Sequence, residues 1–190
     1  RRHVLAMRRQ SADQPEAQDS SAEVINLDIR RRITAVPLTA KPVAGSGVSF
    51  RSRDRELLAS TTRFGKLLQI TDPVTWRIAL EIDLPDAGQQ VITHANVHHL
   101  WVGTASIPGD GPQSALTLIN KDSLKIDASV RESRLSLGPM AFSSNGRKLA
   151  AIAGGKEGAI LVYDTISLLK TQAVRLDDPL AVFSMGRMPK

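Results

Sequence analysis

The chain has 190 residues, a formal net charge of +6 and no cysteine. A chain of this length can bury a sizeable core without covalent cross-links. The missing cysteine excludes disulfides, a thiolate nucleophile and cysteine-held zinc or haem. No apolar run approaches the roughly 18 residues that a membrane helix needs. A sequence without cysteine is compatible with the cytoplasm and with the bacterial periplasm.

One five-residue segment recurs along the chain: Asp or Asn, two variable residues, a hydroxyl residue and a large apolar residue. The copies are 72–76 (DPVTW), 120–124 (NKDSL) and 164–168 (DTISL), and each follows a short apolar run. A weaker copy at 24–28 (VINLD) precedes them, and with Asp28 as its anchor the spacings are 44, 48 and 44 residues. Short strands repeated about every 40–50 residues are typical of β-propeller blades.

A second repeated pattern sets the register inside each blade. Residues 142–150 lie 92 positions after residues 50–58, and a related segment at 93–101 lies between them. Asn145-Gly146 favours a tight hairpin turn because both residues tolerate positive φ. The pattern therefore predicts an antiparallel hairpin in each blade. The matched apolar residues are expected to be buried: Phe50, Leu57, Phe142 and Leu149.

The predicted fold class is all-β, with about four propeller blades of four antiparallel strands each. The expected strands are 3–7, 23–27 and 33–36 in an incomplete first blade; 46–50, 57–61, 66–71 and 77–83; 90–94, 99–104, 114–119 and 125–131; and 139–143, 148–153, 159–164 and 170–176. The corresponding blade boundaries are 1–40, 41–84, 85–132 and 133–178.

Two arrangements of these blades follow. The segment 179–184 resembles an inner strand and could complete the first blade, closing a four-bladed ring without free sheet edges. We favour the alternative, a piece of a larger ring of seven or eight blades, because the chain starts within a blade and ends just after an opening strand. A piece of this kind would expose two blade faces, so we expect it to be unstable alone or to form a homo-oligomer such as a dimer.

Three histidines fall within six residues of the third blade, a pattern compatible with a metal or haem ligand. The repeat places His98 and His99 at a hairpin tip, where solvated turn residues are expected. His94 lies near the end of the inner strand, where it can approach the central channel. We therefore place His94 first as a cofactor-binding candidate and His98 and His99 after it, with no metal site.

Other functional signals are sparse. The basic residues cluster in turns, and no aromatic residues are interleaved with them as a base-stacking surface requires, so nucleic acid is not a predicted partner. No nucleophile elbow, P-loop or metalloprotease motif occurs. The sequence favours a domain that is not catalytic on its own. Long loops at 10–22 and 106–113 share one repeated position and are a possible binding face.

The unit carried by residues 142–149 and 164–168 resembles the YVTN-type blade of bacterial propellers. Within that class, the order of segments resembles the C-terminal half of haem-d1-domain proteins, which include cytochrome cd1 nitrite reductase and a related haem d1 biosynthesis protein. The points of similarity are residues 47–72, the His-containing third blade ending at 101–104, and the closing segment 179–183.

This resemblance implies a periplasmic propeller that binds haem d1 or another tetrapyrrole over its central axis. It further implies that arginines pair the carboxylates of the tetrapyrrole and that His94 is the axial or proximal group. The alternative hypothesis is a non-catalytic propeller scaffold whose loops bind a protein or a cell-envelope partner.

Overall fold

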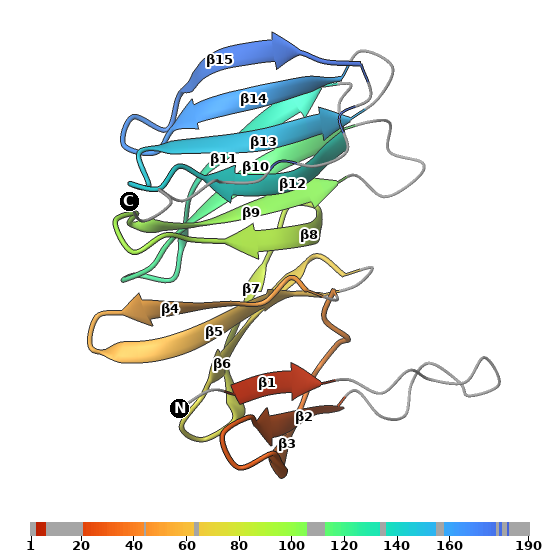
Figure 1. The fold of residues 1–190 in the computed structure, drawn as a ribbon, viewed down its shortest axis with the longest axis vertical. Coiled ribbons are helices and arrows are strands. Elements are labelled where there is room, and N and C mark those ends of the chain that lie inside the picture. Colours follow the sequence, from red (N-terminus) through yellow and green to blue (C-terminus); the bar gives the residue numbers. More distant parts are fainter. Residues whose placement is uncertain are drawn as a thin grey trace, which may run out of the picture.

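The computed structural model describes residues 3–6, 21–43, 45–62, 65–105, 113–133, 136–154, 158–177, 179 and 182. The described residues form fifteen strands in four antiparallel sheets, and the sheets are stacked one on another along the long axis of the molecule (Figure 1). Neighbouring strands in each sheet are also neighbours in sequence. The predicted all-β, blade-like fold class is confirmed.

The strand bounds follow the expected ones within a few residues. The first sheet contains β1 (His3–Ala6), β2 (Ser21–Asn26) and β3 (Arg31–Pro37); the second contains β4 (Val48–Ser52), β5 (Arg55–Thr61), β6 (Leu67–Asp72) and β7 (Arg77–Asp83); the third contains β8 (Ala87–Ile92), β9 (His99–Ala105), β10 (Gln113–Asn120) and β11 (Ile126–Ser133); the fourth contains β12 (Ser136–Phe142), β13 (Lys148–Gly154), β14 (Ala159–Asp164) and β15 (Lys170–Arg175). The proposed inner strand at 179–184 lies outside the described residues except for positions 179 and 182.

The inner hairpins have the expected register. Phe50 pairs with Leu57 across β4 and β5, and Phe142 pairs with Leu149 across β12 and β13. All four side chains are buried, as predicted. The hairpin of the fourth sheet turns at Gly146, which has a φ of 73°. Only glycine adopts such a backbone without steric cost.

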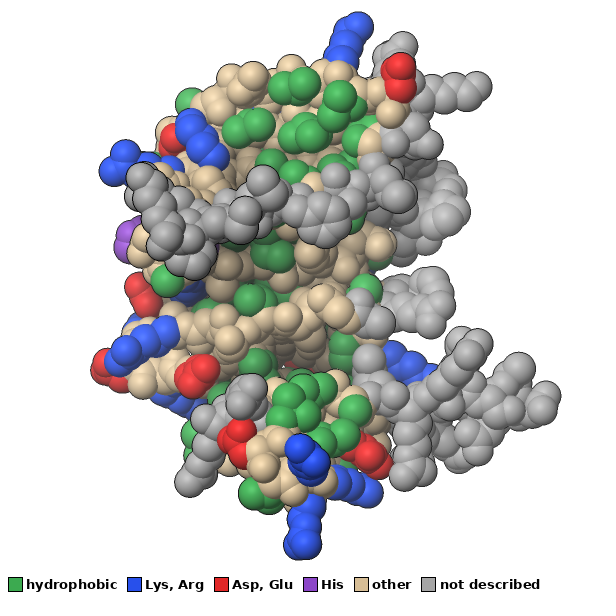
Figure 2. Space-filling model, in the orientation of Figure 1, with side chains coloured by type: hydrophobic (Ala, Val, Ile, Leu, Met, Phe, Trp, Pro, Cys, Tyr) green, Lys and Arg blue, Asp and Glu red, His purple; other side chains and the backbone are tan. Residues whose placement is uncertain are grey.

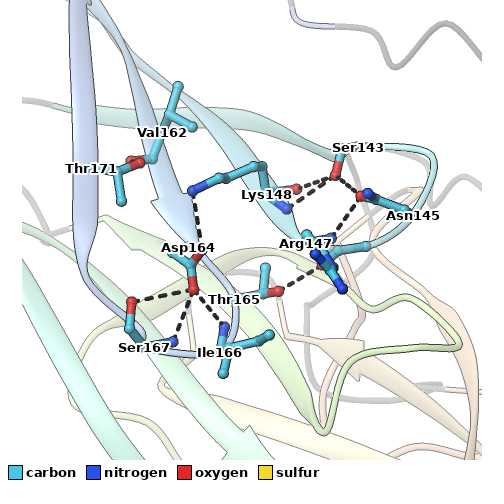
Figure 3. A network of polar contacts seen from close by, with 11 residues as sticks. Ser143, Asn145, Arg147, Lys148, Val162, Asp164, Thr165, Ile166, Ser167 and Thr171 are labelled. Carbon is cyan, nitrogen blue, oxygen red and sulfur yellow. Dashed lines mark hydrogen bonds and ion pairs between the residues drawn. The ribbon is translucent and has the colours of Figure 1, made fainter.

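The repeated Asp/Asn segment forms the outer turn of each sheet, between its last two strands. In the fourth sheet, Asp164 Oδ1 accepts the backbone N–H groups of Ile166 at 3.1 Å and Ser167 at 2.9 Å (Figure 3). The fourth residue after the anchor, Leu168, has a φ of 61° and donates its N–H to the Asp164 carbonyl at 2.9 Å. Positive φ recurs at the same position in every sheet: Arg30, Trp76, Leu124 and Leu168.

The first copy of this turn corrects the predicted anchor. The side chain that accepts the turn N–H groups is Asn26, not Asp28: Asn26 Oδ1 accepts from Asp28 at 2.9 Å and from Ile29 at 3.2 Å. Asn and Asp both cap such turns, and β2 ends at Asn26, which decides between them. The expected anchor is therefore wrong by two residues.

Two apolar clusters hold the second, third and fourth sheets together. One lies between the second and third sheets around Leu57, Ile70 and Leu100, and the other lies between the third and fourth sheets around Trp101 and Leu149. The two end sheets also expose large apolar side chains, which are visible at both ends of the space-filling view (Figure 2). These exposed residues include Leu27, Ile29 and Ile33 at one end and Ile166, Leu169 and Val174 at the other.

Acid should weaken the fold through the outer turns. The Ser167 backbone N–H, followed by the Lys148 ammonium at 3.0 Å, holds the pKa of Asp164 well below its usual range. A carboxylate whose folded-state pKa is depressed contributes stability above its unfolded pKa of about 4, and that contribution is lost as the pH falls through the folded value. Chemical denaturation measured between about pH 5 and pH 2 should therefore show a smaller loss of stability for Asp164→Asn than for the wild type.

The dependence should be reduced and not abolished, because Asp72 titrates in the same way: its pKa is lowered, mainly by the Val74 backbone N–H. The third sheet supplies a natural precedent for the substitution, since Asn120 makes the same turn with a side chain that carries no charge. If the stability of Asp164→Asn and of the wild type fell equally with pH, the Asp164 carboxylate would not contribute to the acid sensitivity of the fold.

Candidate functional site

A cleft of about 690 Å³ lies where the hairpin ends of the second and third sheets meet. Ligand sites of small molecules typically have volumes of roughly 300–1,000 Å³. The second sheet contributes the largely buried Phe50 together with Arg51, Asp54 and Glu56, and the third sheet contributes His94 and Lys121. The cleft therefore combines an imidazole, two cations, two carboxylates and one aromatic side chain.

His94 lies in the turn between β8 and β9, and its ring is held from two sides. The ring packs against Phe142 of the fourth sheet, with 6.0 Å between the ring centroids. Its Nδ1 accepts the backbone N–H of Asn96 at 3.1 Å. The hairpin at Gly146 approaches so closely that a methyl group there would overlap His94 Nδ1. The imidazole is therefore fixed between the third and fourth sheets. His94 also lines the cleft, which lies between the second and third sheets.

The contact with Asn96 decides which ring nitrogen is available to a ligand. A nitrogen that accepts a hydrogen bond uses its lone pair, so the proton of the neutral imidazole lies on Nε2. In this arrangement His94 donates from Nε2. Binding a metal through Nε2 would require the proton to move to Nδ1, and the Asn96 hydrogen bond would then be lost.

Lys121 is the site residue that sequence reasoning missed. Its side chain is buried, and its ammonium donates to the backbone oxygen of His94 at 3.0 Å. The backbone N–H of Lys121 donates to the backbone oxygen of His98 at 3.0 Å. Lys121 follows the anchor Asn120 and counted as a variable position of the repeat. One feature of the sequence could have indicated it: Lys121 is charged, whereas the equivalent residues in the neighbouring sheets, Pro73 and Thr165, are not.

The two other candidate histidines, His98 and His99, do not line this cleft. His98 is exposed in the turn, as expected. His99 is not the solvated turn residue that was predicted: it begins β9, and its side chain is only 14 % exposed. Its Nε2 lies 3.0 Å from Asp127 Oδ2, and the same oxygen accepts from Asn120 Nδ2 at 3.1 Å. The side chain of His99 thus contacts β11, at the far edge of its own sheet.

These contacts also define the electrostatics of that edge. The Asn120 amide, followed by the His99 ring, lowers the pKa of Asp127.

Among the described residues, no group of three or more His, Cys, Asp or Glu side chains could hold a metal ion. The loops at 10–22 and 106–113 lie almost wholly outside the described residues.

A second cleft, of about 680 Å³, lies between the first and second sheets. Its lining is mainly apolar and includes Leu5, Val48, Leu58 and Trp76. It adjoins the sheet that has three strands where the others have four. It also contains His3 and Glu56, but a lysine and an arginine line only the first cleft, which is therefore the candidate site for a ligand with carboxylates.

Stacked antiparallel sheets of this kind define a β-propeller-like domain. Residues 6–188 match the family of the cytochrome D1 heme domain, and the chain belongs to this family. The resemblance to haem-d1-domain proteins is confirmed. None of the described residues forms a helix long and apolar enough to cross a membrane.

Individual proteins agree with this assignment. The chain is 26 % identical over 170 residues to dihydro-heme d1 dehydrogenase of Pseudomonas aeruginosa, covering 89 % of this chain and 34 % of the relative. A solved structure of dihydro-heme d1 dehydrogenase NirN in complex with DHE matches with a TM-score of 0.80 and 25 % identity, over 95 % of this chain and 36 % of that one. The chain thus spans about one third of the length of these relatives.

A more distant match shows the fold alone. Hydrazine synthase of Kuenenia stuttgartiensis superposes with a TM-score of 0.64 at 11 % identity, over 83 % of this chain and 48 % of that protein. Since fold by itself does not determine function, the cleft and its residues must carry the functional argument.

Proposed function

We propose that this chain is a haem-d1-type propeller segment that binds a tetrapyrrole in the cleft between the second and third sheets, with His94 as the cofactor-binding residue. The observation that carries the proposal is the position of His94. Its imidazole is held between the third and fourth sheets, and the residue lines a cleft of suitable volume between the second and third sheets. Membership of the cytochrome D1 heme domain family supports the class of ligand. A related protein is known in complex with DHE.

The side chains of the cleft fit a tetrapyrrole in kind. Arg51 is exposed and offers a guanidinium for a carboxylate substituent, while Phe50 lines the cleft from the buried apolar cluster between the second and third sheets. When bound, the tetrapyrrole supplies the redox-active, light-absorbing group. With Nδ1 engaged by Asn96, His94 would hold it as a hydrogen-bond donor through Nε2. His99 is engaged by Asp127 and His98 is exposed, so we assign the role to His94 alone.

The family relation also supports a periplasmic location. The chain's own residues would bind and orient the group. We assign them no catalytic step. The alternative, a propeller scaffold for a protein or cell-envelope partner, is an outcome of the following experiment.

Titration of the purified protein with haemin should shift the Soret band, and His94→Ala should weaken binding at least about tenfold. A lost hydrogen bond to a bound cofactor, of roughly 1.4 kcal/mol or more, corresponds to that factor. The measurement is an absorbance titration at constant protein concentration, with circular dichroism to verify that the variant is folded.

His98→Ala is the matched control, because it removes an imidazole from the same turn without touching the cleft. It should leave the affinity unchanged. Equal affinity of all three proteins would contradict the role of His94. A wild-type protein that produces no Soret shift would instead favour the scaffold function.

A further inference from the structure

A buried cation with one protein acceptor lies in the cleft. Lys121 is 9 % exposed, and the structure gives its ammonium one hydrogen-bond acceptor among the described residues, the backbone oxygen of His94. An ammonium carries three donor hydrogens. Donors left over on a buried charged group are costly unless a further acceptor is present. The remaining donors are therefore available to a group that enters the cleft.

The fourth sheet shows that the residue after the anchor can connect the outer turn to the hairpin without carrying a charge. In the fourth sheet the residue after the anchor is Thr165, whose hydroxyl donates to the Gly146 oxygen at 2.6 Å and whose N–H donates to the Arg147 oxygen at 3.1 Å. The Lys121 backbone N–H makes the corresponding contact to the His98 oxygen, whereas its ammonium reaches past the residue that aligns with Gly146 to the oxygen of His94, three residues earlier. A neutral hydroxyl thus suffices to tie the outer turn to the hairpin.

The charges around Lys121 compensate it only in part. Burial lowers the pKa of Lys121, and the attraction of Asp122 opposes this without outweighing it. One oxygen of Asp122 accepts the Arg53 backbone N–H of the second sheet at 3.2 Å. The other carboxylates of the cleft, Asp54 and Glu56, are exposed on the facing hairpin, and Asp54 lies 3.8 Å from the Arg51 guanidinium.

We propose that Lys121 is an anion-binding residue that pairs with a carboxylate of the ligand in this cleft. The inference rests on the proposed function and deepens it: it selects tetrapyrroles that carry a free carboxylate on the edge nearest His94. Since the same ammonium holds the His94 backbone oxygen, a bound carboxylate and the imidazole are positioned by one side chain.

The test compares haemin, which has two carboxylates, with haemin dimethyl ester in the same mild detergent. Lys121→Met should weaken haemin binding about tenfold, the loss expected for one charge-assisted hydrogen bond, and should leave binding of the ester unchanged. Lys125→Met, which removes an exposed lysine from the same turn, is the matched control and should bind both compounds as the wild type does.

A second variant guards against a loss that is only structural. Lys121→Thr copies the tie made by Thr165 and should retain the melting temperature and ester binding of the wild type, yet lose the preference for haemin. Equal weakening of haemin and ester in both variants, or no change in either, would overturn the role of Lys121 while leaving the proposed function intact. A wild-type protein that binds neither compound would overturn both proposals.

Discussion

Replacing Trp101 by alanine should lower the free energy of unfolding by about 3–5 kcal/mol, the usual cost of deleting a fully buried aromatic side chain. Trp101 is 0 % exposed on β9, where it packs between the third and fourth sheets. Its ring centroid lies 6.0 Å from that of Tyr163. Both sheets are held by continuous backbone ladders, so the cavity cannot close by local collapse. Domains have only about 5–15 kcal/mol in total, so the loss is large.

Urea unfolding followed by far-ultraviolet circular dichroism measures this loss without relying on tryptophan fluorescence. Trp101→Phe is the control: it keeps an aromatic ring and removes a buried indole N–H that has no hydrogen-bond partner among the described residues. Losing an unpaired donor has no cost, so its stability should lie much closer to that of the wild type. A Trp101→Ala variant that unfolds at the wild-type urea concentration would contradict the packing of these sheets as neighbouring blades.

The parts of this fold that could be predicted from sequence are those whose chemistry is local. The outer turns depend on one Asp or Asn side chain and the backbone N–H groups two and three residues on, so the repeat shows them directly. The inner hairpins depend on apolar residues seven positions apart that face each other across a tight turn. The first blade shows the limit: Asn26 and Asp28 are both of the anchor type, neither is followed by the rest of the pattern, and only the end of β2 distinguishes them.

Only part of the candidate cleft could be predicted from the sequence, for a related reason. His94 was identified by its place beside the inner strand, which the repeat supplies. The partner of His99 is Asp127, 28 residues further on, and pairing across three strands leaves no mark on the local sequence. Lys121 was missed because the repeat treats its position as variable. Its burial arises from the facing hairpin of another sheet, which only the stacked arrangement reveals.

Gly146→Ala should both destabilise the fold and disturb the cleft. At a φ of 73°, any residue with a Cβ atom is strained by about 1–2 kcal/mol. The added methyl group would also overlap the His94 ring, which must then move. The displaced imidazole would lose its contact with the Asn96 N–H. We therefore expect a stability loss greater than the backbone strain alone, accompanied by weaker haemin binding.

Gly45 provides the matched comparison, because its φ is also 73° and a methyl group there would meet nothing within 4 Å. Gly45→Ala should show only the backbone strain and bind haemin as the wild type does. The excess loss in Gly146→Ala belongs to the contact with His94, so combining it with His94→Ala should remove the excess. If Gly45→Ala and Gly146→Ala lose the same stability and the double variant shows no coupling, the hairpin of the fourth sheet does not hold the imidazole, and the cleft must be positioned by its own two sheets.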